Sequence, residues 1–237
     1  MREDNLLAIQ PRAFVRTTDP DHDFDIALNL ASRITLTGPD QLWVADITYI
    51  RLRGEFVFLA VVLDVYTRKV VGWSLSKSLK ASLAIDALVK AIEARKPRPG
   101  LVHHSDRGVQ YACGDYTKLL QKHAITPSMS RPGNPYDNAW CESFMRTLKR
   151  EEIRATEYRD IEHLREKLEE FIDGYYNKIR LHSALNYCSP DAYEVAARSS
   201  TVGSAAIRYF EPPKSLRPEG GTRTVQNNPS AASSCAS

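Results

Sequence analysis

The sequence lacks any apolar run close to the roughly 18 residues that a membrane-spanning helix needs. Its longest apolar run, 56–63, has the length of a buried strand. The opening segment, MREDNLLAIQ, carries acidic side chains and lacks the apolar stretch and small-residue cleavage site of a signal peptide. We therefore expect a cytoplasmic protein without a membrane partner.

Cysteine is scarce, and no two cysteines form a CxxC pair. The four residues are Cys113, Cys141, Cys188 and Cys235. This spacing predicts reduced thiols rather than a zinc knuckle or a disulfide framework. His103, His104 and His182 also lack a paired Cys or His, so we expect no zinc site.

An excess of one charge is also missing, because 32 Lys and Arg nearly balance 29 Asp and Glu. The distribution is uneven: residues 68–133 hold 12 basic against 4 acidic side chains, a local charge of +8. Such a block favours a polyanion through counterion release. A solvated basic face explains the block equally well.

Strand signals dominate the segment 42–75. Residues 41–50 (QLWVADITYI) are rich in β-branched and aromatic types, and 55–65 (EFVFLAVVLDV) is nearly all apolar. A third candidate strand, 69–75, follows the polar turn Tyr66-Thr67-Arg68. These features predict an antiparallel meander.

Helical signals follow the meander. Apolar residues between Leu83 and Ile92 recur at helical spacing, and the pattern stops before Pro97-Arg98-Pro99-Gly100. Asn134-Pro135 is a suitable helix entry. Later elements are predicted as a strand at 101–104, a helix at 115–123, a helix at about 135–150, a long helix at 161–175 and a disordered tail from about 211. This order fits a mixed α/β sheet layered with helices.

Asp46 is the first candidate site residue, because it lies in a strand whose two faces are largely apolar. An unpaired carboxylate buried there would cost several kcal/mol. A cation is therefore expected beside it. An ion pair with an arginine such as Arg107 is the structural explanation, and a metal ion is the functional one.

Asp106 and Glu142 extend this candidate site. Asp106 follows the strand 101–104 in HHSDRGVQY, at the end of a strand where ligands usually bind in open α/β sheets. Glu142 shares one predicted helix face with Asn138, Arg146 and Lys149. An ordinary strand-to-helix turn and a surface pair of Glu142 with Arg146 are the structural alternatives.

Two strand-borne aspartates and a helix-borne glutamate provide the hard oxygen ligands that a pair of Mg²⁺ ions requires. Two such ions catalyse an in-line displacement at phosphorus. Lys149, two turns beyond Glu142, is placed to reach a phosphate next to the scissile bond.

Several segments together resemble the integrase-core transposases of bacterial insertion sequences, of the second-reading-frame type, and more distantly the retroviral integrases. The likeness covers about 40–192 and is carried by LWVADITYI, LDVYTRKVVGW, VHHSDRGVQY, NPYDNAWCESF and YYNKIRLHSALNYCSP. The 35 residues between Asp106 and Glu142 match the spacing in that family.

The resemblance implies a ribonuclease-H-like fold with a mixed five-stranded sheet flanked by helices. It implies that Asp46, Asp106 and Glu142 are the catalytic, metal-binding triad for Mg²⁺ or Mn²⁺, with two ions. The DNA-binding candidates are Lys149, Arg146, Asn138 and Arg107. The implied partners are transposon ends, target DNA and further copies of the chain, in a nucleoid-associated protein.

The expected division of the chain is an arm at 1–39, the catalytic core at 40–155, a helical extension at 156–197 and a disordered tail at 198–237. Full-length relatives carry a helix-turn-helix segment before the core. We expect a partner frame or a missing N-terminal segment to supply it. Without it, DNA binding should be weak and non-specific.

Other polar residues are predicted to be structural. Asp64 belongs to the turn after the second strand, and Asp137 to the first turn of its helix. Tyr176-Asn177, Arg180 and His182 match a family signature for which the sequence offers no physical role. His104 is expected to line the site, because it lies two residues from Asp106.

The preferred function is metal-dependent cleavage at transposon ends followed by strand transfer. A metal nuclease of the same fold and an inactive, DNA-binding remnant of a transposase are the alternatives.

Overall fold

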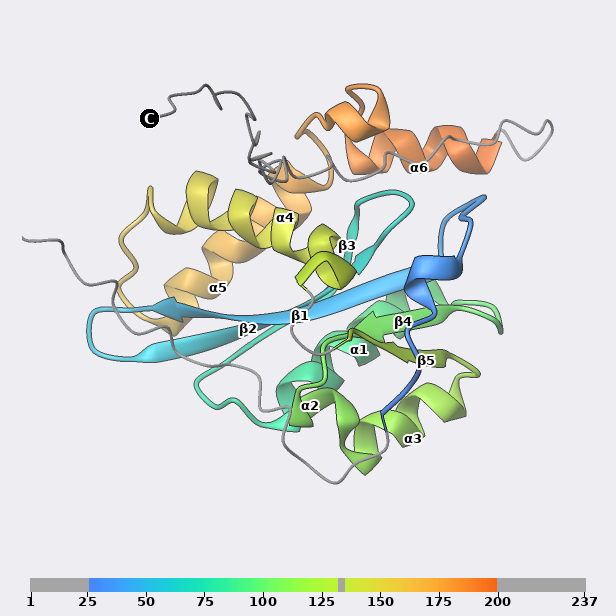
Figure 1. Ribbon diagram of the computed structural model, residues 1–237. Helices are drawn as coiled ribbons and strands as arrows, with labels where there is room; N and C mark the ends of the chain where they lie inside the picture. The colour runs from blue at the N-terminus through green and yellow to red at the C-terminus, as the bar shows by residue number, and fades with distance from the viewer. Residues whose placement is uncertain (1–25, 132–134, 200–237) are drawn as a thin grey trace, which may run out of the picture. The chain divides into compact units, whose positions relative to one another are not determined.

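The computed structural model describes residues 26–131 and 135–199. In this part of the chain, strands form a mixed sheet in the order β3-β2-β1-β4-β5 (Figure 1). The strands are β1 (Leu42–Arg51), β2 (Phe56–Asp64), β3 (Val70–Ser76), β4 (Val102–Ser105) and β5 (Thr126–Met129). Strand β2 pairs antiparallel with both β1 and β3, and β4 and β5 run parallel to β1. The predicted meander and mixed five-stranded sheet are confirmed.

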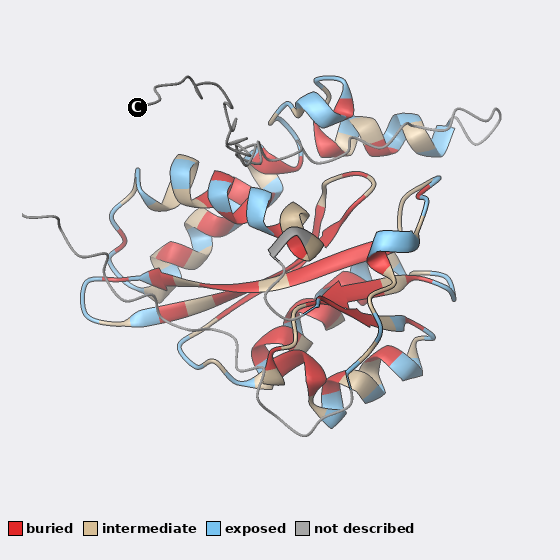
Figure 2. Ribbon diagram, in the orientation of Figure 1, coloured by how far each residue is buried: buried red, intermediate tan, exposed pale blue. Residues whose placement is uncertain are grey.

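Both faces of the central strands are buried (Figure 2). Leu42, Val44 and Ile50 of β1 contribute to one apolar cluster, whereas Trp43 and Ala45 contribute to a second. Because successive side chains of a strand point to opposite faces, the two clusters lie on opposite sides of the sheet. The nearly continuous apolar runs of β1 and β2 follow from this double coverage.

Helices cover both faces of the sheet. They are α1 (Ala81–Arg95), α2 (Val109–Ala112), α3 (Gly114–Lys122), α4 (Ala139–Leu148), α5 (Ile161–Glu169) and α6 (Pro190–Ser199). Short 3-10 segments are η1 (Ala31–Arg33), η2 (Pro135–Asn138) and η5 (Ser183–Leu185), and η3 (Lys149–Ile153) and η4 (Glu170–Tyr176) are π-helical. Helices α1, α2 and α3 pack on one cluster and α4 and α5 on the other (Figure 1).

Two predicted helices are more complex than their sequence patterns. The helix predicted at 135–150 consists of η2, α4 and the start of η3, and the helix predicted at 161–175 changes from α5 into η4. The strand β5 and helix α6 were not predicted individually. Asn134, the arm at 1–25 and the tail from 200 lie outside the described residues.

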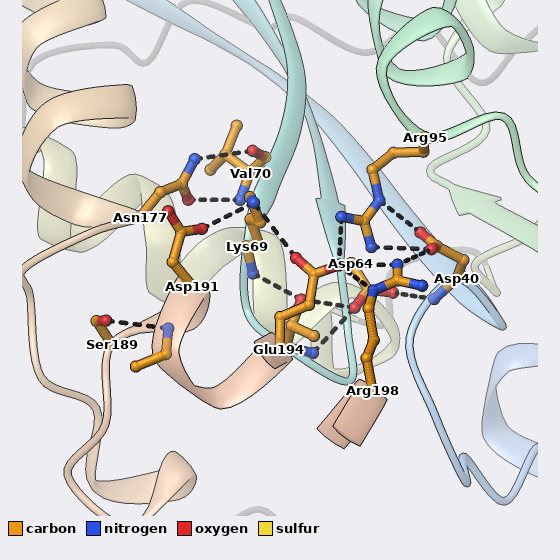
Figure 3. Close-up of polar contacts among 12 residues, drawn as sticks. Asp40, Asp64, Lys69, Val70, Arg95, Asn177, Ser189, Asp191, Glu194 and Arg198 are labelled. Carbon is orange, nitrogen blue, oxygen red and sulfur yellow. Dashed lines mark hydrogen bonds and ion pairs between the residues drawn. The ribbon is translucent and has the colours of Figure 1, made fainter. Parts of the chain in front are cut away.

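Helix α6 is joined to the sheet and to α1 by a partly buried ion network (Figure 3). Glu194, whose side chain is 8% exposed, pairs with Arg95 of α1, with Lys69 beside β3 and with Arg198 of its own helix. Asp40, just before β1, pairs with Arg95 and Arg198. Because a buried carboxylate is costly without partners, these cations make the burial of Glu194 tolerable.

Among the described residues, Cys113, Cys141 and Cys188 are free thiols, as expected. Cys235 lies outside them. No described helix combines the length and the apolar character needed to cross a bilayer.

Candidate active site

Asp46 lies in β1, two residues beyond the end of the β1 ladder with β4, which pairs only Leu42 to Val44. Its carboxylate accepts a hydrogen bond of 2.8 Å from the amide of Ile47. Burial, together with the negative charges of Asp106 and Glu142, raises the pKa of Asp46 to about 7. The structure therefore brings the three predicted carboxylates into one electrostatic neighbourhood.

Asp106 follows β4 directly, and its Oδ1 accepts a hydrogen bond of 2.9 Å from Gly108 N. This contact closes the tight turn at Gly108. Helix α2 begins at the next residue, so the carboxylate of Asp106 is held between a strand end and a helix start. The turn fixes Asp106 beside the strand that carries Asp46.

Glu142 is exposed in the first turn of α4, while its neighbours Cys141 and Phe144 are in the core. Burial raises the pKa of Glu142, whereas the positive charge of Arg146 lowers it. The start of α4 is attached to the sheet because Asn138 Nδ2 donates a 2.9 Å hydrogen bond to Ala45 O. Asn138 thus links the helix that carries Glu142 to the residue before Asp46.

These side chains fit a divalent cation in their chemistry. Carboxylate oxygens are the hard ligands that Mg²⁺ prefers. The mutual repulsion that raises the pKa of Asp46 is the kind that a bound cation relieves. Within 26–131 and 135–199, no three His, Cys, Asp or Glu side chains are already gathered as a metal-binding group.

Lys149, the first residue of the π turn η3, also reaches this neighbourhood. Its Nζ lies 5.5 Å from the ring centroid of Tyr49, a cation–π distance, and Tyr49 is three residues beyond Asp46 in β1. Burial lowers the pKa of Lys149, while the charge of Asp46 raises it. A cation therefore stands beside the carboxylates, and Tyr49 was missed by sequence reasoning.

The other three DNA-binding candidates differ from one another in their exposure and in their contacts. Asn138 is only 8% exposed, and its amide nitrogen is engaged with Ala45 O rather than presented to solvent. Arg107 Nε donates to Ser130 O at 2.7 Å. Arg146 is exposed on α4. Of the four candidates, Lys149 and Arg146 present their charge to the site around Glu142 and Asp46.

The acidic neighbours have structural contacts, as predicted. Asp64 is buried and accepts hydrogen bonds from the amide and hydroxyl of Thr67 and from the amide of Asp40. Asp137 accepts hydrogen bonds from the amide and guanidinium of Arg131. This contact joins β5 to the start of the helical segment that leads to Glu142.

The buried histidines are bonded to hydroxyl groups. His103 Nε2 lies 3.0 Å from the hydroxyl of Tyr116, and the ring nitrogens of His104 lie 2.8 and 3.0 Å from the hydroxyls of Ser128 and Ser130. Burial lowers the pKa of His103 to about 3 and that of His104 to about 4. Both rings are therefore neutral near pH 7.

Tyr111 is a further residue near the carboxylates that the sequence did not single out. It is 3% exposed, and its hydroxyl has no hydrogen-bond partner among the described residues. Its pKa is raised by burial first, then by the charges of Tyr116, Asp106 and Asp46. The tyrosine stands in the quoted segment HHSDRGVQY, but no local pattern marks its hydroxyl as buried.

Comparison with known proteins identifies the same segments. Residues 37–135 and 123–190 each match the family described as "Integrase core domain". The chain is 41% identical over 167 residues to the transposase of insertion sequence element IS904 of Lactococcus lactis, covering 70% of this chain and 66% of that protein. It is 37% identical over 195 residues to transposase InsF of IS3A from Escherichia coli K12, covering 82% and 68%. The chain spans about two thirds of the length of these relatives.

Solved structures share the fold. The intasome of simian T-cell lymphotropic virus in complex with a PP2A regulatory subunit matches with a TM-score of 0.59 at 18% identity, covering 83% of this chain and 66% of that one. The catalytic core of HTLV-2 integrase in complex with magnesium matches with a TM-score of 0.51 at 14% identity, covering 66% and 97%. The expected ribonuclease-H-like sheet flanked by helices is confirmed.

Proposed function

Because the chain belongs to the integrase-core transposases of insertion sequences, we propose that it cleaves DNA at transposon ends and joins them to target DNA. The observation that supports this proposal most directly is the environment of Asp46. A carboxylate in a central strand is placed within the electrostatic reach of Asp106, Glu142 and Lys149. Two acidic strand positions, one acidic helix position and a cation are the components that phosphodiester chemistry uses.

In this proposal Asp46, Asp106 and Glu142 hold two Mg²⁺ or Mn²⁺ ions. When bound, such ions activate the attacking oxygen and stabilise the leaving oxygen of an in-line displacement. The magnesium complex of the HTLV-2 integrase core supports the choice of ion. Asp46 and Asp106 supply oxygens from neighbouring strands, and Glu142 supplies them from the helix facing β1.

The two proposed steps are the same displacement with different nucleophiles. In cleavage, the oxygen of water attacks phosphorus and the 3′-oxygen of the transposon end leaves. In joining, that 3′-hydroxyl attacks a target phosphodiester, and the 3′-oxygen of the target strand leaves with the proton. Lys149 binds the phosphate next to the scissile bond through its ammonium group. The same group makes a cation–π contact with the ring of Tyr49.

The proposed partners are DNA and further copies of the chain. The basic block 68–133 supports affinity for the DNA backbone, which carries no sequence information by itself. Selection of transposon ends is assigned to a helix-turn-helix segment from a partner frame or from a longer chain. Affinity of residues 1–237 for random duplex should therefore fall steeply between about 50 and 200 mM salt.

The test uses a labelled duplex with the terminal repeat of the element, a supercoiled target plasmid and the full chain, with and without a helix-turn-helix partner. We expect cleavage and joining with Mg²⁺ or Mn²⁺ and neither with Ca²⁺. Cleavage without joining would identify a nuclease, and binding without either step would identify a non-catalytic DNA-binding protein.

Matched variants assign the residues. Asp46→Asn, Asp106→Asn and Glu142→Gln keep side-chain shape while removing a ligand charge. Each should abolish both steps and leave the circular dichroism spectrum unchanged. Asp86→Asn, on the distant helix α1, serves as a control and should keep both steps. Activity in any triad variant at the level of this control would remove that residue from the site.

A further inference from the structure

The signature segment around Tyr176 contacts the helix that carries Glu142. The ring of Tyr176 packs edge-on against Phe144 of α4, with ring centroids 4.9 Å apart. Phe144 follows Glu142 by two residues and is 1% exposed. Tyr176 therefore packs against the buried face of the helix that carries Glu142.

Arg180 makes the second contact, with the turn that follows α4. Its Nε lies 3.0 Å from Glu151 Oε2, and its terminal nitrogen lies 3.1 Å from Glu151 Oε1. These are two parallel, charge-assisted hydrogen bonds, which combine strength with a fixed orientation. The two side chains are only 19% and 23% exposed, so solvent screens the pair less than a surface pair.

Glu151 belongs to the π turn η3, which begins at Lys149. The amide of Arg154 donates to Lys149 O at 3.2 Å, so the turn spans five residues instead of four. Such π turns are rare and occur frequently at functional sites. The wider turn changes the direction in which side chains leave the helix, and Lys149 lies at the point where the change starts.

The direction of Lys149 matters because its ammonium group stands over Tyr49 and near Asp46. A lysine side chain has many rotamers, so fixing its backbone limits where its charge is found. Arg180 acts on that backbone through Glu151, and it also stacks on Tyr176 at 5.9 Å. These contacts therefore connect the signature segment, through Glu151, to Lys149.

We propose that Arg180 is a positioning residue, whose paired hydrogen bonds to Glu151 hold the π turn that places Lys149 over Tyr49 at the DNA-binding site. This assignment rests on the proposed function for its DNA step. It gives the signature residues Tyr176 and Arg180 a physical role. Arg180 itself does not bind DNA in this arrangement, because its guanidinium faces a carboxylate.

The first experiment measures the turn without DNA. Amide hydrogen exchange of the full chain is compared between wild type, Arg180→Gln and Glu151→Gln. Exchange at residues 149–154 should accelerate about tenfold in both variants, as expected when a charge-assisted bond is lost. The amides of α1 provide the internal control and should not change. Unchanged exchange at 149–154 would overturn the proposal that Arg180 and Glu151 hold the π turn.

The second experiment measures the salt dependence of binding to random duplex DNA. Lys149→Ala should reduce the slope of log K against log salt by about one, the loss of one phosphate contact. Arg180→Gln should reduce the slope by a similar amount. The double variant with Lys149→Ala and Arg180→Gln should lose no more of the slope than Lys149→Ala alone. Arg180→Lys keeps the charge without the planar fork and should recover only part of the slope.

Glu151→Gln separates positioning from simple charge. This variant makes the chain more positive, so a pure charge effect would raise DNA affinity, whereas loss of positioning lowers it. If the affinity of Glu151→Gln for DNA depended on salt as steeply as that of wild type, or more steeply, the proposal would be overturned. Wild-type protein without salt-dependent binding would instead refute the proposed function, and the exchange data would still decide whether Arg180 holds the turn.

Discussion

Asn177 forms hydrogen bonds with both backbone groups of Val70, a residue 107 positions earlier in the chain (Figure 3). The amide of Val70 donates to Asn177 Oδ1 at 3.0 Å, and Asn177 Nδ2 donates to Val70 O at 3.0 Å. Val70 is the first residue of β3, an outer strand of the sheet. The side chain therefore takes the place of a neighbouring strand at the outer edge of the sheet, where both residues are buried.

This pairing predicts that Asn177→Asp destabilises the protein. The variant keeps the shape but turns an acceptor oxygen toward Val70 O, so one buried carbonyl loses its donor. The expected loss is about 1–3 kcal/mol in the free energy of unfolding, measured by urea denaturation. Asn186→Asp, in the exposed loop before Cys188, is the control. Equal stability of the two variants would contradict the role given to Asn177.

Gly72 predicts a steric effect where β3 meets α1. A β-carbon added there would lie 2.7 Å from Ala91 N and 2.8 Å from Ala91 Cβ, and it would also contact Ala87 O. Two of these atoms are helix backbone and cannot move without displacing α1. Gly72→Ala should therefore lower the thermal unfolding midpoint strongly, while Gly54→Ala, which has open space, should not. An unchanged midpoint for Gly72→Ala would show that α1 shifts freely.

The carboxylate of Asp46, which the proposed chemistry needs, is expected to lower the free energy of unfolding. Its pKa of about 7 lies above the unfolded value of 3.8, because burial and two nearby carboxylates oppose ionisation. Between about pH 4 and pH 7 the unfolded chain releases this proton while the folded chain keeps it, so the free energy of unfolding falls as the pH rises and stays lowered above pH 7. In chelator-containing buffer, Asp46→Asn should be more stable than wild type at pH 8 and not at pH 3.5.

Asp64→Asn is the matched control for that measurement. Asp64 is also buried, and burial raises its pKa to about 6, but its carboxylate accepts hydrogen bonds from Thr67 and Asp40 that lower the pKa and that an amide nitrogen would oppose. This variant should lose stability at pH 8. A gain in both variants would mean that removing any buried charge suffices, and the special crowding at Asp46 would not be needed.

His104 predicts the response to acid. Its pKa of about 4 lies below the unfolded value of 6.5, because burial disfavours the charged ring. As the pH falls from 6.5 to 4, the unfolded chain takes up a proton that the folded chain does not. Stability should fall by about 1.4 kcal/mol per pH unit for this group alone. His104→Gln should show a shallower pH dependence in the same window, and an equal slope would indicate a ring exposed to solvent.

Local sequence determined the elements whose signals are repeated along the chain. The apolar runs of 41–50 and 55–65 require burial on two faces, which identifies central strands without any knowledge of their neighbours. The spacing between Leu83 and Ile92 likewise identified α1, and Pro97 explained its end. The acidic residues Asp46, Asp106 and Glu142 stood out as site candidates, because each contrasts with its local pattern or repeats a family motif.

Tertiary structure decided where partners far apart in the chain meet. The strand β5 contains Pro127, which argues against a central strand but is tolerated at the sheet edge where β5 lies. The π turn at Lys149 cannot be recognised from helical periodicity, which continues through it. Asn138 appeared on an exposed helix face, yet it is bonded to Ala45 O.

The physical reason is that sequence patterns are local, whereas tertiary contacts join residues far apart in the chain. Hydrophobic periodicity reports how a segment meets an apolar surface, and it is the same whichever segment provides that surface. The contacts of Asn177 with Val70 and of Arg180 with Glu151 depend on the path of the whole chain. The sequence therefore singled out the acidic residues of the candidate site, and only the folded chain showed which residues contact the segments that carry them and Lys149.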